Sequence, residues 1–241
     1  MNHVDPHGLY YGAAGPGDGE DDQDDDSFAS DEFVFAPCNM FSILTLGCDS
    51  QNPAPNMRAL RLALLQEWNA LSSDCQNALK TAMPGGNSDP TNISRVGALN
   101  RALSAQPILE QAVTGTNIDW TMLAAIGVRE TGFLNKSEND GVGVGVGVFQ
   151  ITVSSTSGVT AAQARNLTWA ANWASQFLNS NLTKLAAAFP AFDPSQLLQA
   201  TAASYNLGVG GISGNPNTID DGSAHGNYGS NVLSLMTNCF N

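Results

Sequence analysis

A nearly all-apolar segment at residues 118–133 constrains the fold of this chain more than any other part of the sequence. It fits one helix, with Asp119 as its N-cap and Gly132 as its end. A helix that is apolar on all sides belongs in a protein core, so we expect it to be buried. Inside this helix stands the carboxylate of Glu130, which is costly to bury without a function.

The local sequence allows two interpretations of Glu130. A general acid must keep its proton near neutral pH, and burial beside Phe133 and Phe149 and the negative end of the helix dipole favour the protonated form. Alternatively, Glu130 points outward or pairs with Lys136; Arg129 is a poor partner, because adjacent helix positions do not face each other. The local pattern leaves both interpretations open.

Glycine and valine alternate along residues 140–151, which include Gln150 near the end. A period of two predicts a strand whose valine face packs inward. Its other face, with Gly145 and Gly147, lets a sugar or another backbone approach closely. The alternative is a flexible, low-complexity loop, which the glycine content favours.

Apolar spacing and capping residues predict helices on both sides of this segment. Ser72 is among the residues that could divide the first helical stretch in two, a loop is expected at 84–92, and Asp193 followed by Pro194 begins a later helix. We therefore predict a mainly α chain with a small β element. The expected helices are 57–83 (a pair), 93–103, 108–113, 160–189 (one or two), 193–205 and 228–240.

The formal net charge of −13 is concentrated in one acidic run. Residues 18–32 hold nine acids and no base, a pattern typical of a solvated, disordered segment, so we predict a disordered tail over 1–55. The chain lacks the basic patch that nucleic acid requires, and no apolar stretch reaches the roughly 20 residues that cross a bilayer. We expect neither partner, and no cofactor.

The cysteines are Cys38, Cys48, Cys75 and Cys239, and their pairing is open from sequence. Their even number and wide spacing favour two disulfides in an oxidising compartment, with free thiols as the alternative. They form no Cys-x-x-Cys pair, so we expect no metal site. The apolar stretch at 33–48 lies far from the N-terminus and follows acids instead of bases, so it does not predict a signal peptide.

Several motifs follow one another in the second half of the chain. They are a buried helix ending in R-E-T-G-F, a glycine-rich segment ending in G-V-F-Q-I, a long helix to F-P, A-A-S-Y-N-L-G, and D-D-G-S-A-H-G-N-Y-G-S-N-V. In this order they resemble the goose-type lysozyme and soluble lytic transglycosylase family over about residues 118–240. The resemblance implies an α-rich lysozyme-like domain at 118–241 with a cleft beside its β element, and we expect the helices of 56–117 to pack on it.

The resemblance also implies roles for single residues. Glu130 stands where the family has the general acid that protonates the glycosidic oxygen between muramic acid and glucosamine units. Tyr205 and Asn206 match the pair that lines the cleft near the acid, and Gln150 would lie on the cleft strand. Alternatively, Gln150 only ties backbone together, and Tyr205 is a core residue whose hydroxyl is satisfied locally.

The second carboxylate departs from the family pattern. Where goose-type enzymes carry an aspartate after the strand, this chain has Thr152, and Asp140 falls one residue from their other aspartate. Asp140 could act as the base of a hydrolase after a small loop shift, and Glu138 is a poorer choice. Otherwise one carboxylate suffices, as in lytic transglycosylases, where the substrate's own 6-hydroxyl attacks and an anhydro sugar forms.

The residues Asn2 to Leu9 read N-H-V-D-P-H-G-L and resemble the phrase that closes the core of Rhs (YD-repeat) proteins before their variable toxin domains. An ordinary Asp-Pro turn is the alternative. The resemblance implies a monomeric antibacterial toxin domain that is secreted or delivered to a target cell envelope within a larger protein. Its partners would be peptidoglycan and a cognate immunity protein.

Two other functions fit the sequence. One is a glycan-binding module that keeps the fold but lost the second carboxylate at Thr152. The other is a chitin- or chitosan-cleaving enzyme. Many lysozymes are basic, whereas residues 118–241 hold seven acids and four bases, so electrostatic attraction to an anionic cell wall should be weak and direct delivery to the substrate is favoured.

Overall fold

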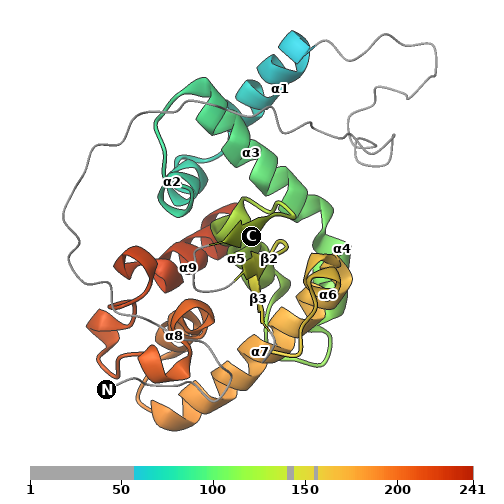
Figure 1. Cartoon of the computed structure of the whole chain (residues 1–241). Coiled ribbons are helices and arrows are strands. Elements are labelled where there is room, and N and C mark those ends of the chain that lie inside the picture. Colours follow the sequence, from blue (N-terminus) through green and yellow to red (C-terminus); the bar gives the residue numbers. More distant parts are fainter. Residues whose placement is uncertain (1–56, 140–143, 155–156, 241) are drawn as a thin grey trace, which may run out of the picture. The chain divides into compact units, whose positions relative to one another are not determined.

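Helices make up most of the chain that the computed structural model describes, which covers residues 57–139, 144–154 and 157–240 (Figure 1). One small antiparallel sheet lies among them. The prediction of a mainly α chain with a small β element is therefore confirmed. The tail predicted to be disordered, with its acidic run, lies outside the described residues, and so do Cys38 and Cys48.

A capping serine begins the second of the first four helices. Ser72 divides the predicted pair, since its hydroxyl accepts a hydrogen bond from the Cys75 amide at 3.1 Å. The loop predicted at 84–92 is shorter than expected, because Asp89 and Pro90 already form the first turn of a helix. The helices are α1 (Met57–Ala70), α2 (Ser73–Ala82), α3 (Asp89–Ser104) and α4 (Gln106–Val113).

A buried arginine fixes the connection between α2 and α3. Arg95 is 1% exposed, and its guanidinium donates to the carbonyl oxygens of Met83 at 3.0 Å and of Gly85 and Gly86 at 3.3 Å. It also donates to the side chain of Asn92 at 2.9 Å. The guanidinium thus satisfies carbonyls that the end of α2 leaves without helical partners.

Helix α5 (Trp120–Thr131) matches the prediction at both ends. Asp119 accepts a backbone hydrogen bond at 2.8 Å, and Gly132 ends the helix in the left-handed conformation, with φ of 63°. The Phe133 amide then donates to the Gly127 carbonyl at 2.8 Å, which ties the residue after the turn back to the last turns of the helix. Most residues of α5 are buried, as the apolar sequence requires.

The sheet is shorter than the glycine–valine alternation predicted. Within the described residues the alternation forms a strand only up to Val146, and 147–150 is a turn with φ of 80° at Gly147 and 49° at Gln150. Glycine reaches this conformation without a steric cost, so the chain reverses there. The strands pair antiparallel in the order β1 (Ser137–Asn139), β2 (Val144–Val146) and β3 (Ile151–Val153).

The stretch at 160–189 forms two helices. Asn166 ends the first and caps the second, accepting a hydrogen bond from the Trp169 amide at 3.0 Å. Asp193 begins the next helix in a capping box with Gln196, as predicted. The elements are α6 (Ala161–Arg165), α7 (Leu167–Ala188), α8 (Pro194–Leu207), α9 (Tyr228–Cys239), and the 3₁₀ turns η1 (Val209–Gly211), η2 (Pro216–Thr218) and η3 (Ala224–Gly226).

Residues 61–241 fall in one compact unit, in which helices from both halves share a core. Cys75 of α2 and Cys239 of α9 form a disulfide, and Arg101 of α3 donates to the Gly132 carbonyl at 2.8 Å. Among the described helices, none has the length and apolar character that a membrane crossing needs. The core includes Leu79, Leu99, Leu109, Leu123, Ile126, Phe149, Leu178 and Leu235.

Candidate functional site

Glu130 lies at the end of the buried helix α5 and meets the first residue of α9. It is half-buried, and Tyr228, which is 2% exposed, donates a hydrogen bond from its hydroxyl to Oε1 of Glu130. The two helices pack side by side (Figure 1). A carboxylate and a phenol from distant parts of the sequence are therefore held together at the edge of the core.

The end of α5 is fixed by a glycine and a hydroxyl. A Cβ at Gly127 would lie 2.6 Å from the Phe133 ring and 2.9 Å from Val148, so only glycine lets these side chains pack so closely on the helix. The Thr131 hydroxyl donates to the Val148 carbonyl at 3.0 Å. These contacts join the last turn of α5, and with it Glu130, to the turn that precedes β3.

A buried aspartate positions Tyr228. Asp220 is 6% exposed and accepts hydrogen bonds from the amides of Gly229 at 2.7 Å and Ser230 at 2.9 Å, and from the Gln199 side chain at 2.9 Å. A carboxylate at the N-terminus of a helix satisfies free amides and complements the helix dipole. Asp220 thereby anchors the first turn of α9, which carries Tyr228.

Tyr205 of α8 stands on another side of the site. Its hydroxyl donates to the Phe149 carbonyl at 2.8 Å, and its ring meets the Phe177 ring edge-to-face with centroids 5.8 Å apart. Its hydroxyl is thus satisfied locally, as the alternative interpretation of Tyr205 expects. Burial, and next the charge of Glu130, raise the pKa of the Tyr205 phenol well above its ordinary value.

The same two causes, in the same order, raise the pKa of Tyr228 well above its ordinary value, and its hydrogen bond to Glu130 adds to them. The phenol therefore stays protonated near neutral pH and acts as a donor. Arg129 opposes this shift, since its guanidinium carbon lies 5.5 Å from the Tyr228 ring centroid. Within the described residues, Nε of Arg129 is buried without a hydrogen-bond partner.

Asn206 follows Tyr205 on α8 and holds the loop that leads to α9. Its Oδ1 accepts a hydrogen bond from the Ala224 amide at 2.9 Å. Because Ala224 begins η3 and α9 starts four residues later at Tyr228, Asn206 fixes the approach of the chain to the site. Among the described residues, the side-chain amide nitrogen of Asn206 makes no hydrogen bond, so it can donate one to a ligand.

The residues predicted on the sheet side make backbone contacts. Gln150 donates from its amide to the carbonyls of Gly147 at 2.9 Å and Lys136 at 3.3 Å, so it ties the turn together. A Cβ at Gly145 would lie 2.5 Å from the Gln150 amide oxygen, and one at Gly147 would overlap the Ala164 carbonyl of α6. The glycines thus leave space for other atoms of the protein. The sequence predicted a close approach here either by another part of the chain or by a sugar.

Of the two carboxylates considered as the second one, the structure describes only the strand position of Glu138. Asp140 lies outside the described residues, so its role stays a prediction. Glu138 of β1 and Thr152 of β3 both lie opposite Gly145, on the two sides of β2. The described part of the chain holds no group of His, Cys, Asp and Glu side chains that could bind a metal ion.

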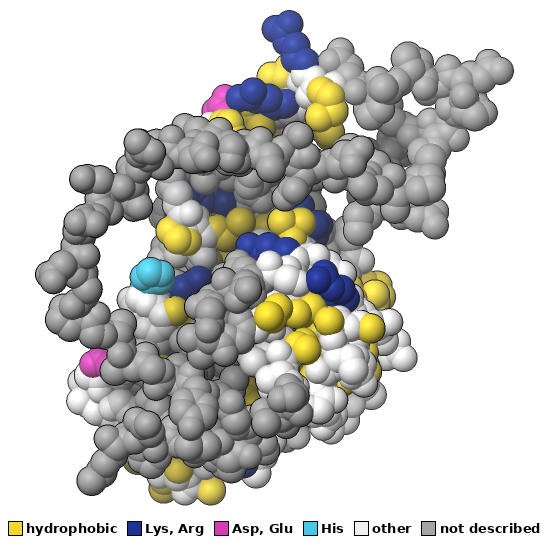
Figure 2. Space-filling view, viewed as in Figure 1, with side chains coloured by type: hydrophobic (Ala, Val, Ile, Leu, Met, Phe, Trp, Pro, Cys, Tyr) yellow, Lys and Arg dark blue, Asp and Glu magenta, His cyan; other side chains and the backbone are white. Residues whose placement is uncertain are grey.

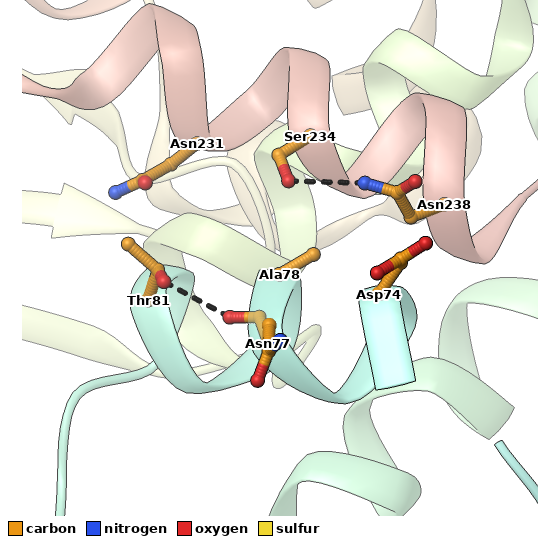
Figure 3. A pocket seen from close by; sticks show the side chains of 7 residues that line it. All are labelled: Asp74, Asn77, Ala78, Thr81, Asn231, Ser234 and Asn238. Carbon is orange, nitrogen blue, oxygen red and sulfur yellow. Dashed lines mark hydrogen bonds between the residues drawn. The ribbon is translucent and has the colours of Figure 1, made fainter. Parts of the chain in front are cut away.

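Two surface grooves occur away from Glu130. One, of about 260 Å³, runs between α2 and α9, and Figure 3 shows polar side chains of both helices facing each other across it. The other, of about 580 Å³, lies on α6 and α7. On the face drawn in Figure 2, Lys and Arg side chains occupy the upper and middle parts, and the visible Asp and Glu side chains lie towards its margins.

No protein-family model matches this chain, and no curated protein matches its sequence. The function must therefore be argued from the site. The site contains two residues that sequence reasoning missed, Tyr228 and Asp220. Both lie in the motif D-D-G-S-A-H-G-N-Y-G-S-N-V, which contributes to the family resemblance but assigns no role to either residue. A tyrosine at a helix start, preceded by an aspartate that could cap that helix, was the signal available.

Proposed function

We propose that this protein is a peptidoglycan glycosidase, either a muramidase or a lytic transglycosylase, with Glu130 as its general acid. The observation that carries the proposal is the hydrogen bond from the buried Tyr228 hydroxyl to Glu130 at the end of a core helix. The order of the sequence motifs around both residues supports a lysozyme-like fold for 118–241. The hydrogen bond fixes the orientation of the carboxyl group, which a general acid needs in order to reach the leaving oxygen.

The proposed reaction begins with proton transfer from Glu130 to the glycosidic oxygen. Tyr228 occupies Oε1, so the other carboxyl oxygen carries the proton towards substrate. The bond between the protonated glycosidic oxygen and C1 of muramic acid then breaks, and the glucosamine end leaves as an alcohol. General acid catalysis of this kind contributes about 10²- to 10⁴-fold to the rate.

The nucleophile decides between the two versions of the reaction. In a muramidase, water attacks C1 and gives its proton to a base, the role proposed for Asp140. In a lytic transglycosylase, the 6-hydroxyl of the muramic acid attacks C1 and returns a proton to Glu130, now a carboxylate. The first version yields a reducing sugar, and the second an anhydro sugar.

The proposed setting is a toxin domain at the C-terminal end of an Rhs-type protein, delivered to the cell envelope of a competitor and neutralised by an immunity protein. The motif N-H-V-D-P-H-G-L at residues 2–9, which resembles the end of the Rhs core, supports this setting. The Cys75–Cys239 disulfide also supports it, because such bonds persist in oxidising compartments. Direct delivery would make electrostatic attraction to the wall unnecessary.

The test is the clearing of purified cell-wall sacculi by the wild type, by Glu130→Gln and by Glu110→Gln. Glu110 is an exposed carboxylate on α4 that serves as a matched control. The wild type and the control should clear the suspension, and Glu130→Gln should lose at least about 100-fold in rate. Equal clearing by Glu130→Gln would contradict the assignment of the acid.

A glycan-binding module without catalysis is the second candidate, and the threonine at position 152 favours it. It predicts that the wild type sediments with sacculi but leaves their turbidity unchanged. A chitin- or chitosan-cleaving enzyme would instead clear those polymers and spare sacculi. The same assay on the three polymers therefore separates all three functions.

A further inference from the structure

The groove on α6 and α7 is separate from the residues assembled around Glu130. Its volume is about 580 Å³, and it is open at the surface. Its wall contains one tryptophan, three side-chain amides and one hydroxyl, and no charged residue. The lining residues are Ala162, Gln163, Asn166, Thr168, Trp169 and Asn172.

Each amide in this wall is fixed through one of its two polar ends. Oε1 of Gln163 accepts from the Thr160 amide at 2.9 Å, and Oδ1 of Asn166 accepts from the Trp169 amide at 3.0 Å. The side-chain nitrogen of Asn172 donates to the Thr168 carbonyl at 2.8 Å. The groove therefore has amides whose orientation is set before any ligand binds.

The other polar group of each amide has no such hydrogen bond. Gln163 and Asn166 keep their NH₂ groups as donors, and Asn172 keeps its oxygen as an acceptor. Within the described part of the chain, none of these three groups makes a hydrogen bond. Fixed donors and an acceptor in one uncharged wall match a ligand that carries several hydroxyl or acetamido groups.

Trp169 supplies an aromatic surface in the same wall. Its side chain packs partly on the core and is partly exposed at the groove. A large ring that is already held by the core loses little conformational entropy when it binds a ligand. The face of the indole can pack against the C–H groups of a sugar ring. An indole and oriented amides together are the groups that recognise a neutral saccharide.

We propose that this groove binds a sugar unit of a glycan strand and holds the protein on the wall polymer outside its catalytic centre. The identity of that polymer as peptidoglycan rests on the proposed function. Helix α6 connects the groove to the sheet, because the Ala164 carbonyl packs on Gly147 and the Asn135 side chain donates to the Arg165 carbonyl at 3.1 Å. A strand bound there would lie on the sheet side of the molecule.

The groove between α2 and α9 makes a weaker case and provides a control. Asn77 and Asn238 line it, but it contains no aromatic ring, is smaller, and has the carboxylate of Asp74 in its wall (Figure 3). Asn77 is exposed on α2, as Asn172 is exposed on α7. The two asparagine-to-alanine changes therefore form a matched pair in different grooves.

The experiment uses the full chain carrying Glu130→Gln, so that bound glycan is not cleaved. Sedimentation with sacculi gives the affinity, and ¹⁵N-labelled protein titrated with the β-1,4-linked N-acetylglucosamine trimer shows which indole signals shift. The added variants are Trp169→Leu, Trp169→Phe, Asn172→Ala and Asn77→Ala. Thermal melting checks each fold, and Asn172→Ala decides the question if Trp169→Leu does not fold.

The expected result is that Trp169→Leu and Asn172→Ala weaken binding to sacculi about three- to tenfold, with Trp169→Phe and Asn77→Ala close to the parent protein. The trimer should shift the Trp169 indole signal more than those of Trp68 and Trp120. Unchanged binding by Trp169→Leu and Asn172→Ala, with no shift at Trp169, overturns this inference. A wild type that clears no sacculi overturns the proposed function instead, and the trimer titration still tests the groove.

Discussion

The helical wall of the site, which carries Glu130, Tyr205 and Tyr228, differs in construction from the sheet beside it. In the helical wall, polar side chains are held by partly buried hydrogen bonds and by helices that share the core. In the sheet and the turn that follows β2, glycines leave space for close contacts, with the Gln150 side chain at Gly145 and with the Ala164 backbone at Gly147. Changes in the helical wall should therefore alter chemistry, and changes in the sheet should alter stability.

The largest expected effect tests the sheet. Gly147→Ala should destabilise the fold by about 2–4 kcal/mol, because the new methyl group overlaps the Ala164 carbonyl and the backbone has φ of 80°. Gly115→Ala is the matched control, since Gly115 has φ of 79° and open space around it. Chemical denaturation measures both. Equal losses would mean that backbone strain alone, and not packing on α6, accounts for Gly147.

The next effect tests the helical wall. Tyr228→Phe removes the hydroxyl that holds Glu130 and should lower kcat on sacculi about 10- to 100-fold, the value of a hydrogen bond to a charged group. The melting temperature should also fall by a few degrees, because the same hydrogen bond contributes to stability even though the ring stays in place. Tyr205→Phe is the comparison, since its hydroxyl donates to a backbone carbonyl. A larger loss of activity in Tyr205→Phe would reverse the roles assigned to the two phenols.

A substitution of Gln150 tests whether the sheet side of the site contacts substrate. Gln150→Ala removes the hydrogen bonds to the carbonyls of Gly147 and Lys136 and should lower the unfolding free energy by about 1–2 kcal/mol. The kcat and KM of the folded enzyme should stay near wild type. A severalfold rise in KM without loss of stability would instead give Gln150 a direct contact with substrate.

The smallest effect should be seen at alkaline pH. Tyr205 and Tyr228 have pKa values raised above those of the unfolded chain, so above about pH 10 the unfolded state has lost protons that the folded state still holds. Their contribution to stability is complete below the unfolded pKa and is lost as pH rises through the folded values. Denaturation of wild type and Tyr228→Phe across this range should show a shallower decline in the variant.

Local signals were enough to predict the helices around the site. Asp119 and Gly132 mark the two ends of α5, and Asp193 with Pro194 marks the start of α8. The start of α3 was missed because a loop-like composition before it concealed Asp89 and Pro90. In each case the information lies within a few residues of the helix end.

Contacts between distant segments were not predictable in the same way. The turn at 147–150 depends on the approach of Ala164 from α6, which the alternation of glycine and valine does not contain. The pairing of Tyr228 with Glu130 depends on how α9 packs against α5. The cost of burying a carboxylate therefore singled out Glu130 from the sequence, but not the phenol that donates to it.

The most direct test of the central claim is the mass of the muropeptides that wild type and Glu130→Gln release from purified peptidoglycan. The account predicts glycan fragments from the wild type and none from Glu130→Gln, with fragments one water lighter if the 6-hydroxyl is the nucleophile. Release of the same fragments by Glu130→Gln, or none by a wild type that is folded and bound to the wall, would contradict it.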